Sequence, residues 1–245
     1  MNRPNLLITG LSSGVGLSLA RHFAGRYRVI GLVRKLEDTR RMLEDVPDLM
    51  LYGVDLSDPT ALTACLDRIV EEHGTSLRLI NNAGVNHPAR IEQLTLRDLS
   101  ASLQVNCLAP LAIMQRVLPD MVDAGYGRII NITSGAPLNC FAGFAAYSAS
   151  KAALNAVTVT AAREYADRDI RINLMSPGPV RSNMAPDAPM DPSVCHPTAD
   201  YLLEMPADGP TGRFFWLGRE IPLFPDLEGI QWLQGRAPER FRRVL

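Results

Sequence analysis

Short apolar runs alternate along the chain with longer segments in which apolar residues recur every three or four positions. The short runs are rich in Val, Ile and Leu, as buried strands are, and the longer segments have the period of amphipathic helices. Strands are predicted over residues 5–9, 27–33, 49–54, 77–80, 128–133 and 171–175, and helices over 15–24, 59–72, 96–124 with a break near Pro110, and 145–166. This alternation predicts an α/β fold, a doubly wound parallel sheet with helices on both faces.

Length and proline content indicate how the chain is organised. The 245 residues suit a single domain over 1–245, with no internal repeat or linker. Ten of the 18 prolines lie between Pro177 and Pro225, and proline neither donates to a sheet ladder nor fits inside a helix. We therefore expect irregular structure in this region, with residues 183–210 forming a substrate loop.

Composition excludes several classes of partner. The chain is 47% hydrophobic and 21% charged, as ordinary globular proteins are, and its net charge of -1 gives no reason to expect nucleic acid or membrane as a partner. No segment has the length of a signal peptide or of a membrane span, so a cytoplasmic location is expected. The four cysteines are far apart, which favours buried reduced thiols over disulfides or metal ligands. The arginines near the end are expected to solvate a terminal helix; they are Arg236, Arg240, Arg242 and Arg243.

A glycine-rich segment follows the first predicted strand and opens the first predicted helix. After Thr9 it reads Gly10-Leu11-Ser12-Ser13-Gly14-Val15-Gly16. Glycines at such a turn let a pyrophosphate approach the backbone, and the free N–H groups of the helix start face the phosphates. The spacing differs from the common G-x-G-x-x-G pattern, and an ordinary strand-to-helix turn is the alternative interpretation.

The end of the second predicted strand bears on the choice of cofactor. An acidic residue here would bind the ribose 2'-hydroxyl of NAD, but the strand ends in Val33 and Arg34. Arg34 can hold a 2'-phosphate through a charge-assisted, two-pronged contact, so the sequence favours NADP, with NAD possible. The alternative for Arg34 is an ordinary solvated arginine.

Tyr147 and Lys151 lie four residues apart at the start of a predicted helix, so they share one face. A nearby ammonium favours the phenolate, which is expected to lower the tyrosine pKa toward the range of a general acid or base. The Y-x-x-x-K spacing is common on solvated helices. However, Lys35 and Lys151 are the only lysines among 25 basic residues, which favours a specific role for an ammonium at position 151.

Together these residues resemble the short-chain dehydrogenase/reductase family, in its short single-domain branch. The resemblance covers about residues 6–184 and implies a Rossmann-type fold that binds NAD(P). Its motifs follow in order: the glycine turn, Asp55, Asn81-Asn82-Ala83-Gly84, Asn106, Ser134, Tyr147 with Lys151, and Pro177-Gly178 followed by Val180 and Ser182. The family implies that Ser134 holds the substrate oxygen and Tyr147 exchanges a proton with it. It further implies that Lys151 binds the nicotinamide ribose, and that Asn106 kinks its helix and keeps a water beside the lysine.

The resemblance also implies a set of cofactor contacts. Asp55 and Leu56 should border the adenine, although Asp55 has the alternative of capping the next helix. The segments that should contact the rest of the cofactor are Gly10, Ser12, Ser13, Gly14, Val15, Gly16 and Arg34 at the phosphates, Asn82, Ala83 and Gly84 at the adenosine ribose, and Tyr147, Lys151, Pro177, Gly178, Val180 and Ser182 near the nicotinamide. No metal is required.

The function that this resemblance implies is hydride transfer between NADP(H) and an alcohol or carbonyl carbon. If residues 135–144, Met184 and Met190 face the site, the pocket is apolar and suits a lipophilic ketone or acyl carbonyl; ordinary packing or a subunit contact is the alternative. Asn86 and His87 are candidates for the border of that pocket. Two other functions stay open: an NAD-linked alcohol dehydrogenase, and a cofactor-binding regulatory protein without turnover.

The end of the chain departs from the family pattern. A last strand is expected over 212–216, and the tail over 217–245, which contains Trp232, is atypical. Family members usually form dimers or tetramers through their fourth and fifth helices. The apolar face of residues 99–122 is therefore expected to be buried by a partner, giving a homodimer or homotetramer.

Overall fold

The computed structural model describes residues 3–225 and 238–240. Within these residues one sheet has the order β3-β2-β1-β4-β5-β6-β7-β8. Its strands are β1 (Asn5–Thr9), β2 (Arg28–Val33), β3 (Met50–Gly53), β4 (Arg78–Asn81), β5 (Gly127–Ile132), β6 (Ile170–Ser176), β7 (Phe214–Trp216) and β8 (Arg219–Ile221). All neighbours pair parallel except β8, which pairs antiparallel with β7. The predicted Rossmann-type, doubly wound sheet is confirmed, with one antiparallel strand added at its edge.

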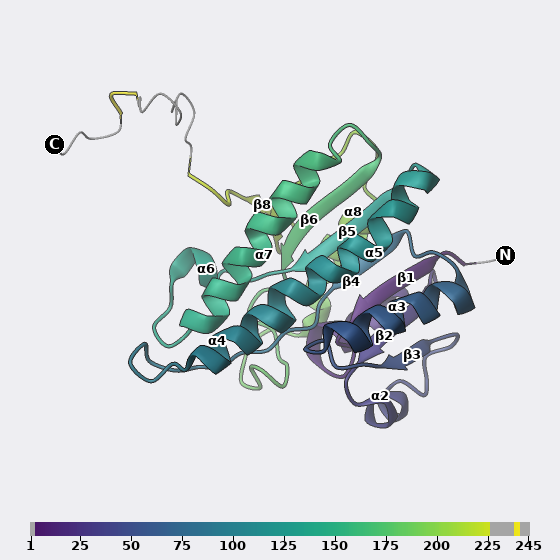
Figure 1. Cartoon of the computed structure of the whole chain (residues 1–245), viewed down its shortest axis with the longest axis horizontal. Helices are drawn as coiled ribbons and strands as arrows, with labels where there is room; N and C mark the ends of the chain where they lie inside the picture. Colours follow the sequence, from purple (N-terminus) through teal and green to yellow (C-terminus); the bar gives the residue numbers. More distant parts are fainter. Residues whose placement is uncertain (1–2, 226–237, 241–245) are drawn as a thin grey trace.

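Helices cover both faces of this sheet. They are α1 (Gly14–Phe23), α2 (Leu36–Met42), α3 (Pro59–His73), α4 (Leu96–Leu103), α5 (Ala109–Ala124), α6 (Ala136–Asn139), α7 (Ala145–Glu164) and α8 (His196–Leu203), with a π-helix over Gln104–Leu108 and a 3₁₀-helix over Pro192–Cys195. Figure 1 shows α3, α5 and α7 in front of the sheet. The opposite face carries α1 and α8, whose buried side chains share one core cluster.

The two cores follow from the alternation of side chains along each strand. In β1, Leu6 and Ile8 point into the core under α1, while Leu7 between them points into the core under α3 and α5. All three are almost fully buried, and each contributes about 1.5–3 kcal/mol by leaving water. Strands buried on both faces explain why the sequence shows continuous apolar runs.

Helix ends carry their expected signals. Asp58 caps α3, because its carboxylate accepts from the N–H groups of Thr60 and Ala61, both at 3.0 Å, and Pro59 follows as the first helical residue. Helix α5 is followed by Gly125, whose φ of 65° is the left-handed conformation that commonly ends a helix and that glycine adopts easily. These caps fix where the chain leaves each helix for the next strand.

Three parts of the fold differ from the sequence-based expectations. Helix α2 was not predicted, because its residues are mostly exposed and only Thr39 among them is buried. The proline-rich segment is not wholly irregular, since Pro192 and Pro197 each lie in the first turn of a helix, where proline is tolerated. The residues expected to bury a partner are largely buried within the chain itself; on α5 these are Ile113, Met114, Val117, Leu118 and Met121.

The edge strand β8 returns from β7 through a two-residue turn. Leu217 and Gly218 both have positive φ, as the turns of tight hairpins require. Phe214 of β7 is buried, whereas Trp216 is 39% exposed. The expected tail therefore begins as a strand; Trp232, Arg236, Arg242 and Arg243 lie outside the described residues.

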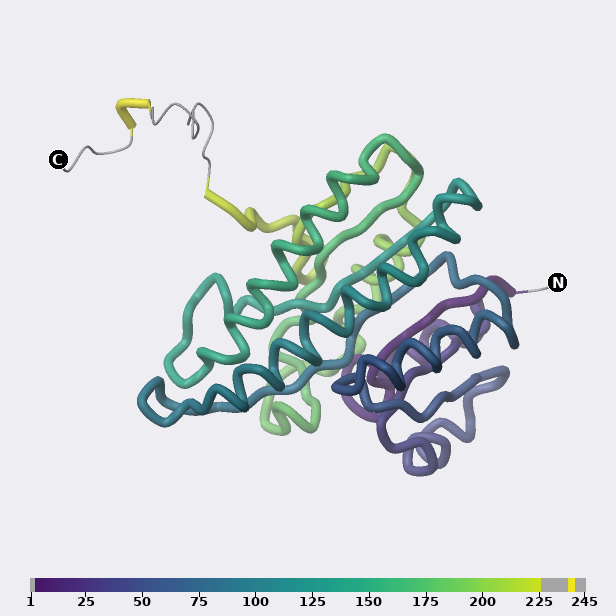
Figure 2. Tube along the Cα trace, viewed as in Figure 1, coloured from purple at the N-terminus to yellow at the C-terminus, as the bar shows by residue number. Residues whose placement is uncertain are grey.

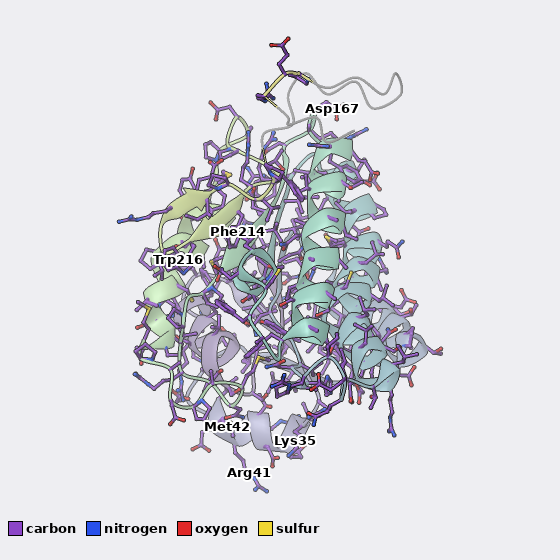
Figure 3. The ribbon with its side chains drawn as sticks, turned by 90° about the vertical axis from the view of Figure 1, so that its left-hand side faces the viewer. Lys35, Arg41, Met42, Asp167, Phe214 and Trp216 are labelled. Atoms are coloured by element: carbon purple, nitrogen blue, oxygen red, sulfur yellow. The ribbon has the colours of Figure 1, made fainter. Side chains whose placement is uncertain are left out.

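The carboxyl ends of the parallel strands lie together at one end of the molecule. Lys35, just after β2, and Asp167, just after α7, lie at opposite ends of the molecule (Figure 3). The segments that follow β4, β5 and β6 all leave at the end where Lys35 lies, which is the carboxyl edge of the parallel sheet (Figure 2). In doubly wound sheets, ligands bind at this edge.

No helix among the described residues has the length and apolarity that a bilayer crossing needs.

Candidate active site

A cleft of about 400 Å³ opens at the carboxyl edge of the sheet. Its walls come from segments that follow six parallel strands, β1 to β6, because the carboxyl ends of parallel strands meet at one edge. Seventeen of the predicted site residues line it: Gly10, Ser12, Ser13, Val15, Arg34, Asp55, Leu56, Asn82, Ala83, Gly84, Ser134, Tyr147, Lys151, Pro177, Gly178, Val180 and Ser182. The fold thus gathers residues that are up to 172 positions apart in the sequence.

Gly14 and Gly16 do not line the cleft, but the absence of their side chains allows the turn beneath it to pack closely. A Cβ on Gly16 would lie 2.1 Å from the carbonyl oxygen of Gly10, and one on Gly14 would lie 2.6 Å from the Cβ of Ser182. Gly10 has a φ of 73°, and its Cβ would lie 2.8 Å from the Cα of Ala83. The turn is therefore bare backbone at the start of α1, which fits the phosphates of a dinucleotide.

Asn82 and Thr9 hold this turn in place. The Asn82 side-chain amide donates to the carbonyl oxygens of Thr9 and Gly10, both at 2.9 Å. In return, the Thr9 hydroxyl accepts from the backbone N–H groups of Asn82 and Ala83, at 3.0 and 2.9 Å. The Asn82 side chain thus supports the phosphate turn from behind, and Thr9 is a site residue that the sequence analysis placed only in the motif.

Arg34 and Asp55 lie at the end of the cleft formed by β2 and β3. The backbone N–H and hydroxyl of Ser57 donate to Asp55 Oδ1, at 2.9 and 2.7 Å. These bonds, opposed by partial burial and helped by the nearby Arg34 guanidinium, lower the pKa of Asp55. The helix cap is Asp58, not Asp55, so the alternative role for Asp55 is wrong. Arg34 is exposed and lines the cleft.

Lys151 lies buried beneath Tyr147 on α7. Its ammonium donates to the carbonyl oxygen of Ile132 over 2.8 Å and lies 5.9 Å from the centre of the Tyr147 ring. Burial lowers the pKa of Lys151 to about 8. Burial also raises the pKa of Tyr147, opposed by a hydrogen bond with the Ser134 side chain. The expected lowering of the tyrosine pKa is therefore wrong in direction for this structure, because loss of hydration outweighs the neighbouring groups.

Asn106 lies in the π-helix between α4 and α5, behind the cleft rather than in its lining. Its Oδ1 accepts from the N–H of Val85 at 2.8 Å, and its Nδ2 donates to the carbonyl of Val85 and to Ser150 Oγ, both at 2.9 Å. Ser150 in turn donates to the carbonyl of Tyr147 at 2.8 Å. Asn106 therefore ties the segment after β4 to the helix that carries Tyr147 and Lys151. The helical layer is irregular at Asn106, where it forms the π-helix.

The substrate end of the cleft differs from the expected apolar wall. Of that wall only Met184 lines the cleft, whereas Phe141 is exposed and Phe144 packs edge-on against the Tyr147 ring at 6.4 Å. The chain after β5 turns away from the cleft at α6. Asn86, Met190 and His87 also lie outside the lining, and His87 Nδ1 is 3.0 Å from the Ser102 hydroxyl. Asn183 and Ala185, at the start of the predicted substrate loop, also line the cleft. The lining residues that the sequence analysis missed are Leu32, Val54, Val85, Val105, Ile132, Thr133, Ser176 and Pro179.

The thiols are free in the structure, but not all are buried. Cys107 and Cys195 are buried, Cys65 is half-buried and Cys140 is exposed. Within the described part of the chain, no group of three or more His, Cys, Asp or Glu side chains is arranged to hold a metal ion.

The fold and the cleft agree with comparisons to known proteins. Residues 4–192 match the family described as short chain dehydrogenase. A 2,5-dichloro-2,5-cyclohexadiene-1,4-diol dehydrogenase from Sphingobium indicum is 32% identical over 191 residues, which cover 74% of this chain and 76% of that protein. A 3-oxoacyl-(acyl-carrier-protein) reductase from Thermotoga maritima is 30% identical over 188 residues, covering 75% of this chain and 76% of the reductase.

A solved structure extends the likeness to three dimensions. The crystal structure of a metagenomic short-chain oxidoreductase in complex with NADP superposes with a TM-score of 0.79 at 27% identity, covering 88% of this chain and 97% of that one. The match spans both the glycine turn and the helix with Tyr147 and Lys151. This chain belongs to the short-chain dehydrogenase/reductase family and is an NAD(P)-dependent oxidoreductase.

Proposed function

We propose that this chain is an NADPH-dependent reductase of a ketone or acyl carbonyl carried by an apolar substrate, with cofactor and substrate sites in one domain over 1–245. The observation that carries the proposal is the convergence of Ser134, Tyr147 and Lys151 on one cleft whose far end presents Arg34. Binding a dinucleotide needs the glycine turn, but it does not need a buried phenol, hydroxyl and ammonium together. The presence of all three groups in the cleft therefore argues against a regulatory protein without turnover.

The chain's own groups account for the proton chemistry. The bound cofactor would supply the hydride, and the protein would supply position and charge. Because burial raises the pKa of Tyr147, its phenol is protonated near neutral pH, which is the form that can donate a proton to a carbonyl oxygen. Ser134 Oγ would donate a hydrogen bond to the same oxygen and so polarise the carbonyl. Lys151, charged below about pH 8, would favour the phenolate that forms when Tyr147 has given up its proton.

The choice of NADPH rests on Arg34. It follows β2 at the adenosine end of the cleft, and Asp55, the nearest acid in the lining, is already bonded to Ser57. An exposed arginine directly after this strand, where an acid would bind a ribose 2'-hydroxyl, suits a 2'-phosphate better. An NAD-linked alcohol dehydrogenase is the second candidate, and the dehydrogenase among the similar proteins favours keeping it.

The apolar character of the substrate rests on the side of the cleft near Tyr147. Val85, Val105 and Met184 line the cleft and supply its apolar surface there. Apolar side chains with few polar groups are typical of pockets for lipophilic ligands. The similar acyl-carrier-protein reductase acts on a 3-oxoacyl group, which fits an acyl carbonyl here.

We also propose a homodimer or homotetramer. Leu96 and Leu108, at the start of α4 and in the π-helix, are 81% and 46% exposed and leave apolar surface on this layer. Light scattering after size exclusion would give the mass directly. A monomer at all concentrations would contradict this part of the proposal.

One assay tests the reductase proposal. NADPH and NADH absorbance would be followed against a panel of ketones, aldehydes and acyl thioesters, with Tyr147→Phe as the inactive variant. Tyr165→Phe, at the end of the same helix, is the matched control because it removes a phenol outside the cleft. We expect preference for NADPH, near-complete loss of turnover in Tyr147→Phe and unchanged turnover in Tyr165→Phe. Equal activity in all three proteins would remove Tyr147 from the mechanism.

A further inference from the structure

A polar ladder joins α1 to α8 on the face of the sheet away from α3, α5 and α7. Its members recur every four residues, the first two on each helix and the third just after the helix ends, and every pair is separated by 178 residues. The two helices therefore run parallel in one register. The pairs are Ser18 Oγ with His196 Nε2 at 2.7 Å, His22 Nε2 with Asp200 Oδ1 at 2.9 Å, and Arg26 Nη1 with Glu204 Oε1 at 2.8 Å. We call this set the α1–α8 ladder.

The ladder connects the phosphate turn with the segment that lines the substrate end of the cleft. Helix α1 begins at the turn. Residues 179–191, which we call the substrate hairpin, lead through the 3₁₀-helix Pro192–Cys195 into α8. Despite this short name it is a closed loop and not a pair of antiparallel strands: Arg181 N donates to Met190 O at 2.9 Å and Met190 N donates to Pro179 O at 3.2 Å, which makes a parallel bridge between Val180 and Met190. Its Ser182 leaves no room for a side chain on Gly14, so the hairpin rests on the turn. Met190 of the hairpin also packs against the core cluster that α1 and α8 share, so the position of α8 on α1 bears on the hairpin.

The first two pairs of the ladder bring two titratable rings together. The imidazoles of His196 and His22 stack with their centroids 4.1 Å apart. Burial, followed by the His22 ring, lowers the pKa of His196. Other charged groups surround it: Arg21 from α1, Arg181 and Asp191 from the hairpin, and Asp200 from α8, which pairs with Arg26 just after α1. Asp191 pairs with Arg181 and Asp200 with Arg26, so these two carboxylates offset a proton on His196 only in part, and burial together with the stacked His22 ring outweighs them.

We propose that the α1–α8 ladder is a pH-dependent clamp, in which neutral His196 holds the substrate hairpin on the phosphate turn and a proton on His196 loosens it. The direction follows from linkage. The pKa of His196 in the closed structure lies below its ordinary 6.5, so the closed form binds fewer protons than an open form with a hydrated ring. The clamp is therefore strongest above pH 6.5 and weakens as the pH falls below it. His196 is a positioning residue, and this role goes beyond the proposed reductase activity.

Hydrogen exchange read by mass spectrometry tests the clamp without any need for turnover. Peptides covering the substrate hairpin would be compared at pH 7.5 and 5.5, after correction for the intrinsic exchange rates. His196→Gln keeps an amide that can bond to Ser18 but cannot titrate. His73→Gln is the matched control, because His73 is also half-buried and lies 2.7 Å from a hydroxyl, that of Tyr52, on another part of the protein.

We expect wild type and His73→Gln to lose hairpin protection at pH 5.5, by up to about tenfold for each pKa unit that separates the closed and open forms. His196→Gln should be equally protected at both pH values. His22→Gln, which keeps a donor for Asp200 but removes the stacked ring, should show a smaller pH effect than wild type. Equal protection of wild type at both pH values, or wild-type behaviour of both ladder variants, would overturn the clamp. A protein without reductase activity could still pass this test, so the two proposals fail separately.

Discussion

The bare backbone of the phosphate turn yields the sharpest prediction, for Gly16→Ala. A methyl group on Gly16 would lie 2.1 Å from the Gly10 carbonyl oxygen and 2.5 Å from Asn82 Nδ2. Both atoms belong to the network in which Asn82 bonds the turn, so neither can move alone. The turn must then shift away from α1. Overpacking of this kind costs about 1–3 kcal/mol.

The loss should appear in two measurements. Urea unfolding should show the free energy of unfolding lowered by that amount, and the thermal midpoint should fall by about 2–4 °C for each kcal/mol in a chain of this size. NADPH binding, followed by titration of the cofactor's fluorescence, should weaken about tenfold for each 1.4 kcal/mol spent on restoring the turn.

Gly25→Ala is the matched control, since a Cβ at Gly25, just after α1, meets nothing within 4 Å. It should leave both stability and NADPH affinity within experimental error of wild type. If Gly16→Ala also melts and binds NADPH like wild type, the close approach of the turn to α1 is not what shapes this site.

Two further predictions concern charge. Arg34→Asp should weaken NADPH binding by about tenfold to a hundredfold, the size of a charge-assisted hydrogen bond, with little effect on NADH. Lys35→Asp makes the same charge change outside the cleft and should leave both constants alone, so an equal loss in the two variants would indicate a general field effect. Because the pKa of Lys151 is lowered, the folded protein releases the Lys151 proton at a lower pH than the unfolded chain does. The free energy of unfolding should therefore rise between about pH 8 and 10.5. Over the same range turnover should fall, because the ammonium is lost. Lys151→Met should flatten that rise in urea melts, and an unchanged slope would place the proton on another group.

Much of the fold could be predicted because strands buried on both faces are continuous apolar runs. Helices α2 and α8 were not predicted, each for a different physical reason. Helix α2 has a polar sequence with one buried residue, Thr39, so no periodic apolar pattern marks it. Helix α8 was hidden by the prolines around it, which disfavour a helix interior but are tolerated in a first turn. Proline content alone does not distinguish an irregular segment from one in which each proline begins a helix.

At the site, the sequence indicated which residues meet, but not their electrostatics. The four-residue spacing of Tyr147 and Lys151 places both on one side of α7, and both line the cleft. The spacing says nothing of how deeply they are buried, and burial sets the direction of both pKa shifts. Phe141 and Phe144 failed as a pocket wall for a similar reason, because the turn of the chain at α6 depends on three-dimensional packing.

The short return strand β8 has a consequence for how this protein behaves in concentrated solution. Without it, β7 would present an open row of N–H and C=O groups at the edge of the sheet, which is a template for pairing with another molecule. Instead β8 covers that row, and its Arg219 and Glu220 are both exposed. Charged side chains on a three-residue border strand discourage further strand addition. Removing residues after Trp216 should therefore promote aggregation, even with the cleft itself left intact.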